Sequence, residues 1–170
     1  LNYHADKMKW VSLPPFPGEG RILSTAAVCD STLFIIGGCS LSRDNSGETS
    51  RTYLSDMIGY DMTSKDPSKW GSSGRQQLAG PGMPVAAAAG PAPVRENSIL
   101  LIGGDKRGNS PDPSRPVVQS RDILVYDVIG NTWTRQGEWP VGIATVPAVV
   151  RGSEIMTISG ETAPGVRTPV

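Results

Sequence analysis

The 170 residues predict an all-β fold assembled from a repeated unit of short strands. The main observation is a run of β-branched and large apolar residues that ends in small residues. It occurs three times, at 32–38, 98–104 and 154–160. Each run has the length and composition of a buried strand, and the glycines at its end allow the positive φ of a tight turn. In addition, 20 glycines and 15 prolines are spread along the chain, as expected when turns connect many short elements.

A second motif follows two of the three runs at equal distances. It consists of a Tyr-Asp pair and a later tryptophan, present as Tyr60-Asp61 with Trp70 and as Tyr126-Asp127 with Trp133. An apolar stretch also precedes each run, at 26–28, 85–89 and 146–150. Each unit is therefore expected to contain four strands: an inner strand, the strand that ends in small residues, and, after a long loop, a Tyr-bearing and a Trp-bearing strand.

Gly-Gly followed at equal distance by Tyr-Asp, and then by Trp, in two units resembles the kelch repeat, in which about 50 residues form four strands. The resemblance implies a kelch-type β-propeller, whose blades are four-stranded sheets arranged around a channel. The tyrosines and tryptophans are then expected to pack the blades, and we predict that Tyr126 and Trp133 are largely buried.

The two ends of the chain carry complementary halves of a blade. Tyr3 and Trp10 are separated as Tyr126 and Trp133 are, yet no Gly-Gly precedes them, and the last run has no Tyr or Trp after it. We predict outer strands of a split blade at 1–20, blades at 21–80 and 81–140, and inner strands of the split blade at 141–170. About three blades are too few to close a ring. We therefore expect half of a six-bladed propeller, completed by a head-to-tail homodimer or by the remaining half of a longer chain.

Charge and composition argue against several partners and ligands. The 16 basic and 16 acidic residues cancel, which argues against nucleic acid and anionic membranes as partners. No apolar run reaches the roughly 18 residues of a membrane-spanning helix. Cys29 and Cys39 are expected to be free thiols, one of them buried, rather than a disulfide. Together with the single histidine, His4, they make a zinc site improbable, so no metal is expected.

One stretch has a more specific resemblance. Residues 159–168, Ser-Gly-Glu-Thr-Ala-Pro-Gly-Val-Arg-Thr, resemble the Gly-Glu-x-x-Pro-Gly-x-Arg-Thr segment of the kelch-type N-acetylneuraminate epimerases, or sialic acid mutarotases. The resemblance implies that Glu161 is the proton acceptor and that Arg167 binds the substrate. It also implies a sugar acid as substrate, no cofactor, and a periplasmic or secreted location.

The chemistry of these residue types suits such a reaction. A planar arginine can hold the carboxylate of sialic acid by two charge-assisted hydrogen bonds. A carboxylate of suitable pKa can remove the anomeric proton and so open the ring. Further clamps are expected from arginines in or at the end of the loops that follow the Gly-Gly turns, namely Arg51, Arg115 and Arg121.

Two other functions compete with the mutarotase. A non-enzymatic kelch module that binds proteins or glycans would favour exposed aromatic residues on these loops. The stretches 40–52, 105–121 and 161–170 contain no Trp, Tyr or Phe, which favours a polar small-molecule site. A copper-radical oxidase, an activity of some kelch propellers, needs tyrosine and histidine ligands that a single histidine does not supply.

Overall fold

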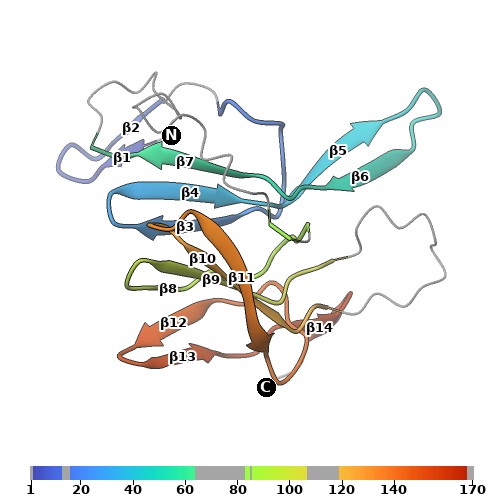
Figure 1. Ribbon diagram of the computed structural model, residues 1–170. Coiled ribbons are helices and arrows are strands. Elements are labelled where there is room, and N and C mark those ends of the chain that lie inside the picture. Colours follow the sequence, from blue (N-terminus) through green and yellow to red (C-terminus); the bar gives the residue numbers. More distant parts are fainter. Residues whose placement is uncertain (1, 13–15, 64–82, 85, 107–118, 168–170) are drawn as a thin grey trace.

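The computed structural model describes residues 2–12, 16–63, 83–84, 86–106 and 119–167, which form small antiparallel sheets stacked side by side (Figure 1). All regular elements in these ranges are strands, so the predicted all-β class is confirmed. Within the same ranges no helix is long and apolar enough to cross a membrane.

The most complete sheet is the blade in the middle of the chain. Its order is β11-β10-β9-β8, and its strands are β8 (Val94–Arg95), β9 (Ser98–Ile102), β10 (Asp122–Asp127) and β11 (Thr132–Glu138). Tyr126 pairs with Ile99 on one side and Trp133 on the other. Its side chain is fully buried, as predicted. Trp133 is only half-buried, because β11 is the outermost strand of the sheet.

The preceding blade repeats this pattern with three described strands. They are β3 (Thr25–Cys29), β4 (Thr32–Ile36) and β7 (Met57–Asp61), in the order β3-β4-β7. Tyr60 pairs with Leu33 as Tyr126 pairs with Ile99. The expected fourth strand with Trp70 lies outside the described residues. The stretch after Gly38 was predicted to be a loop and is instead a hairpin of β5 (Cys39–Arg43) and β6 (Thr49–Tyr53).

The prediction of an inner strand at 85–89 is wrong, because the described residues of that stretch do not form a strand. The strand at this position is β8, a few residues later, whereas Ala88 makes only an isolated bridge with Asp105. Gly90, Pro91 and Pro93 explain the shift, because proline has no N–H for a strand ladder. In the other two units the inner strand agrees with the prediction to within a few residues: β3, and β12 (Ala148–Arg151).

Half-sheets lie at both ends of the chain. The first is β1 (Asn2–His4) with β2 (Lys9–Val11), and the second is β12 with β13 (Glu154–Thr157). Tyr3 pairs with Trp10 in the register of Tyr126 and Trp133, and the ring centroids are 5.0 Å apart in the first pair and 5.1 Å in the second. The N-terminal hairpin therefore has the geometry of the two outer strands of a blade.

Backbone conformation repeats from unit to unit. Leu23, Ala89 and Thr145 occupy the same place in successive units and have φ values of 58°, 59° and 53°. They are joined in series, since Ala89 N–H donates to the Leu23 carbonyl and Thr145 N–H donates to the Ala89 carbonyl, both at 2.8 Å. The left-handed region is uncommon for residues other than glycine. These hydrogen bonds between neighbouring units offset the free-energy cost of the left-handed backbone conformation.

The main core lies between the first two blades. It includes Phe34, Ile36 and Met57 from one blade and Ile99 and Tyr126 from the other. The rings of Phe34 and Tyr126 meet edge to face at 5.9 Å. Blade-to-blade packing therefore buries the aromatic motif that defines the repeat.

Both cysteines are buried and neither forms a disulfide, whereas the prediction had only one of them buried. Cys29 is on β3 and donates from Sγ to the Glu96 carbonyl in the next blade at 3.5 Å. Burial raises the pKa of the Cys29 thiol, with a smaller contribution from nearby Asp30. The thiol is therefore protonated at neutral pH and behaves as a small apolar side chain.

Candidate functional site

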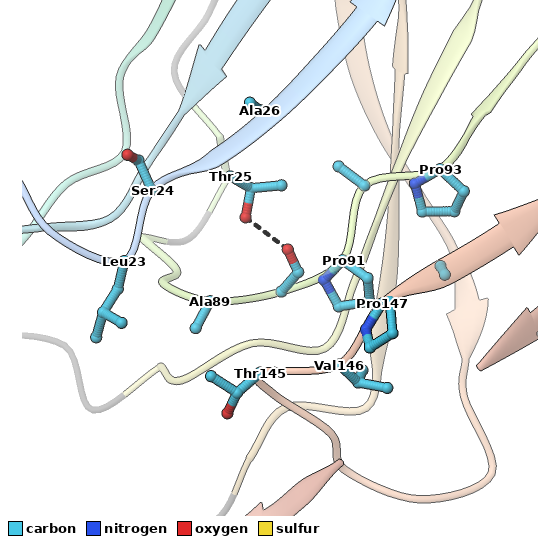
Figure 2. A pocket seen from close by; sticks show the side chains of 13 residues that line it. Leu23, Ser24, Thr25, Ala26, Ala89, Pro91, Pro93, Thr145, Val146 and Pro147 are labelled. Atoms are coloured by element: carbon cyan, nitrogen blue, oxygen red, sulfur yellow. Dashed lines mark hydrogen bonds between the residues drawn. The ribbon is translucent and has the colours of Figure 1, made fainter. Parts of the chain in front are cut away.

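The inner segments of the three units together line a cavity of about 510 Å³ (Figure 2). The lining comes from residues 23–26, 89–93 and 145–148, one stretch from each unit. The Thr25 hydroxyl donates to the Gly90 carbonyl at 2.5 Å and ties the first stretch to the second. We call this cavity the channel, and its volume lies in the range of small-molecule sites.

One residue per unit stands where a strand leaves the sheet at the end of this channel. Cys39, Asp105 and Glu161 follow the second small residue of each run and form bridges with Ile22, Ala88 and Ala144. Each bridge partner directly precedes a channel residue. We call Cys39, Asp105 and Glu161 the mouth positions. The hairpins β5–β6 and β14–β15 leave the sheets at this same end of the molecule, opposite the β3–β4 and β12–β13 turns (Figure 1).

The third unit brings together the two residues of the predicted acid–base site. Glu161 begins β14 (Glu161–Ala163), and Arg167 ends β15 (Val166–Arg167), directly opposite in register. Pro164 and Gly165 form the turn between them, and the Gly165 φ of 73° fits the glycine of a type II turn. Arg167 Nη2 is 4.0 Å from Glu161 Oε2, and the exposed fractions of the two side chains are 67% and 21%. An exposed cation thus lies beside a partly covered carboxylate.

The second mouth position is closed by a contact that the sequence analysis did not find. Tyr53, at the end of β6, donates from its hydroxyl to Asp105 Oδ2 at 2.7 Å, and both residues are buried. Tyr53 lies one residue beyond the predicted loop at 40–52. Its partner belongs to the next blade, so only the packing of two units reveals the pair.

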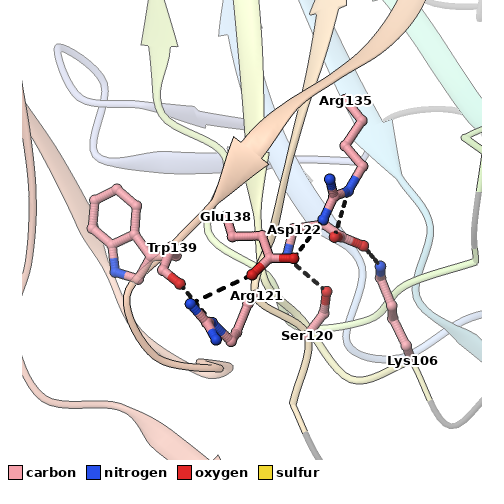
Figure 3. A network of polar contacts seen from close by, with 7 residues as sticks. All are labelled: Lys106, Ser120, Arg121, Asp122, Arg135, Glu138 and Trp139. Atoms are coloured by element: carbon pink, nitrogen blue, oxygen red, sulfur yellow. Dashed lines mark hydrogen bonds and ion pairs between the residues drawn. The ribbon is translucent and has the colours of Figure 1, made fainter.

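The other predicted arginines have different surroundings. Arg51 is exposed on β6, two residues before Tyr53 and on the same face of the hairpin. Arg121 donates from Nε to the Trp139 carbonyl at 2.9 Å, and its Nη2 is 3.4 Å from Glu138 Oε2 (Figure 3). Arg121 is thereby held at the outer strand of its own blade. Arg115 lies outside the described residues.

Asp122, on β10, connects the residue that follows Asp105 to the neighbouring strand β11. It accepts hydrogen bonds from Lys106, the residue after Asp105, and from Arg135 at 2.7 Å (Figure 3). The hydrogen bond from Lys106, supported by that from Arg135, lowers the pKa of Asp122 below its usual value. The two ends of the long connection between β9 and β10 are therefore fixed to each other. Across the described ranges, no three His, Cys, Asp or Glu residues cluster as a metal site would require.

The fold defines the class of protein: the chain folds into blades of a kelch-type β-propeller. The solved structure of YjhT matches it with a TM-score of 0.68 and 21% sequence identity. That match covers 94% of this chain and 50% of YjhT.

Among curated proteins, the chain resembles the N-acetylneuraminate epimerases. The protein of that name from Yersinia enterocolitica is 23% identical over 94% of this chain and 45% of its own length. The Haemophilus influenzae (strain PittEE) protein is 25% identical, over 94% of this chain and 46% of its own length. The chain thus spans about half the length of the curated relatives it matches. No family model matches the sequence.

Proposed function

We propose that this chain forms part of a sialic acid mutarotase-like isomerase, which interconverts the α and β anomers of N-acetylneuraminate by opening and closing the sugar ring. The pairing of Glu161 with Arg167 at the end of the channel is the observation that carries the proposal. The resemblance to proteins named N-acetylneuraminate epimerase gives independent support.

In this proposal Glu161 is the general base. Its carboxylate removes the proton of the anomeric hydroxyl, the anomeric carbonyl forms, and the bond to the ring oxygen breaks as that oxygen takes up a proton. The open keto form rotates, and the same steps in reverse close the ring on the other face. A positioned carboxylate typically contributes about 10²–10⁴-fold to such proton transfers.

Arg167 holds the substrate carboxylate in the same proposal. Its side chain is 67% exposed, so the guanidinium has donors available for a bidentate pair with an anion. Arg51, which shares a face with Tyr53 near the mouth, is proposed as a second clamp, and Arg115 and Arg121 are further candidates. The substrate is then a small sugar acid, no cofactor takes part, and a periplasmic or secreted location follows from the resemblance.

We propose that the rest of the ring is supplied in one of two ways. Either a second copy supplies it in a head-to-tail homodimer, or the other half of a longer chain does. In both cases β13, whose described partner is β12 alone, is proposed to pair with a Tyr-Trp hairpin such as β1–β2. An open sheet edge readily accepts a strand.

Anomer-exchange NMR of N-acetylneuraminate, with and without protein, tests the proposal directly. Glu161→Gln is expected to remove most of the exchange while leaving sugar affinity nearly unchanged, because only proton transfer is lost. Arg167→Ala is expected to weaken binding. Full exchange by Glu161→Gln would show that the proposed base is wrong.

The chain offers a matched control pair. Arg151 and Glu154 form a 2.6 Å ion pair across the β12–β13 turn, at the opposite end of the same half-sheet. Arg151→Ala and Glu154→Gln change the same residue types and should leave exchange at the wild-type rate. Sugar binding without any exchange in the wild type would instead favour the second candidate, a propeller that acts as a glycan-binding module.

A further inference from the structure

Thr145 is the polar member of the row formed by Leu23, Ala89 and Thr145. The three residues have φ values of 58°, 59° and 53°, and all line the channel. Figure 2 shows their side chains pointing in roughly the same direction. Each directly follows the bridge partner of a mouth position, so the row forms the end of the channel nearest the mouth. The unit that contains Glu161 is therefore the one with a hydroxyl at this place.

The backbone makes threonine an unexpected residue at this position. A β-branched residue with positive φ is an outlier, and glycine would relieve the crowding at its Cβ. The hydrogen bond to the preceding unit comes from the main-chain N–H of Thr145, which any residue except proline supplies. Residues held in such sparsely populated conformations cluster at functional sites. The scaffold does not need this side chain, and its presence points to a role in the channel.

The Thr145 hydroxyl is accessible to a ligand. The residue is exposed, and its side chain makes no hydrogen bond with any residue that the structure describes. The other two hydroxyl groups of the lining differ from it. Thr25 donates to the Gly90 carbonyl at 2.5 Å, and Ser24 points away from the row (Figure 2). An accessible polar group in a mainly apolar cavity is the arrangement typical of small-molecule sites.

Thr145 is also close to the proposed base in the main chain. Ala144, the residue before it, exchanges two main-chain hydrogen bonds with Glu161, both 2.9 Å long. The Cα atoms of such a pair are about 5.5 Å apart, and consecutive Cα atoms are about 3.8 Å apart. The Cα atoms of Thr145 and Glu161 therefore lie within about 10 Å of each other. One sugar can span this distance.

We propose that Thr145 is a substrate-binding residue of the Glu161 site, and that its hydroxyl forms a hydrogen bond with a polar group of the sugar acid at the mouth end of the channel. This inference rests on the proposed function. Together with Arg167, which holds the carboxylate in that proposal, the contact sets the orientation of the sugar relative to Glu161.

The test compares Thr145→Val with Thr145→Ser by calorimetric titration with N-acetylneuraminate. It uses the full 170-residue chain, in the assembly in which it purifies. Valine keeps the β-branched shape without the hydroxyl, whereas serine keeps the hydroxyl. Thr145→Val should weaken binding by about 3- to 10-fold, the usual effect of one lost hydrogen bond, and Thr145→Ser should stay within about twofold of the wild type. The thermal midpoint of Thr145→Val, and its exchange rate at saturating sugar, should stay near the wild-type values.

Thr134→Val is the matched control. Thr134 is an exposed threonine on β11, the outermost strand of its blade, and the same change there should leave affinity and exchange at the wild-type values. Wild-type affinity of Thr145→Val, or equal losses of affinity in both Thr145 variants, would overturn the inference and leave the proposed function standing. If the wild type does not bind N-acetylneuraminate, the function and the inference fail together.

Discussion

The complete blade and the N-terminal hairpin contain the same aromatic pair in different surroundings. Tyr126 and Trp133 belong to a four-stranded sheet, and Tyr126 is fully buried. Tyr3 and Trp10 have the same register and ring distance, yet 44% and 62% of their surfaces are exposed. The hairpin thus has this local geometry while its aromatic pair is largely exposed. Burial of the aromatic pair requires the inner strands and the neighbouring blade.

The largest expected effect is on assembly. If the split blade is completed by a second copy, light scattering of the purified chain should give twice the monomer mass, and Trp10 fluorescence should be shielded from soluble quenchers. The physical reason is the combination of exposed apolar side chains on the N-terminal hairpin with an edge of β13 that can accept a strand. A stable, folded monomer would exclude the homodimer.

The next effect compares the two aromatic pairs directly. Tyr126→Ala should lower the free energy of unfolding by about 3–5 kcal/mol, because it empties a site in the main core. The variant for comparison is Trp10→Ala, which should cost less than about 1 kcal/mol in a monomer, since Trp10 is largely exposed. Chemical denaturation followed by circular dichroism measures both. Equal losses would mean that the N-terminal hairpin is covered in solution.

A smaller effect concerns charge. Asp122→Asn in the complete blade should lower the free energy of unfolding by about 1–2 kcal/mol, because it weakens charge-assisted bonds from Lys106 and Arg135. The pKa of Asp122 is lowered in the folded state, so its stabilisation is present above the unfolded pKa of about 3.9. It is lost as the pH falls through the lower folded pKa.

Unfolding curves from pH 7 down to pH 2 measure this contribution. The difference in free energy of unfolding between wild type and Asp122→Asn should shrink as the pH approaches 2. Glu154→Gln in the β12–β13 hairpin is the control, and it should have little effect at any pH because its ion pair with Arg151 is well exposed. A difference for Asp122→Asn that stays constant with pH would contradict the stabilising role assigned to the Asp122 carboxylate.

The smallest effect concerns the turn that ends each run. Ser159, with a φ of 65°, stands where the other units have Gly37 and Gly103. Ser159→Gly should therefore raise the free energy of unfolding, by up to about 1 kcal/mol. Gly103→Ser should do the opposite, since an added Cβ would lie 2.4 Å from the Ile143 carbonyl oxygen of the next unit. Thermal unfolding of both variants measures these changes in stability. A stabilised Gly103→Ser would refute the structural equivalence of Ser159 and Gly103.

Sequence patterns predicted the strands that end in small residues and the Tyr-bearing strand after them, because each pattern is local. They misplaced one inner strand, since an apolar stretch at 85–89 looks like a strand until the prolines after it are considered. The Pro164-Gly165 turn was predictable from its residue types. The Tyr53–Asp105 contact was not, because it depends on how one blade packs on the next.

In the row formed by Leu23, Ala89 and Thr145, the main chain and the side chains have separate roles. Main-chain atoms make the links between units in this row, and all three residues border the cavity. A large apolar, a small apolar and a polar side chain occupy the same backbone state. Side chains along the channel can therefore be exchanged during evolution or design without a change to the hydrogen bonds that hold the blades in sequence.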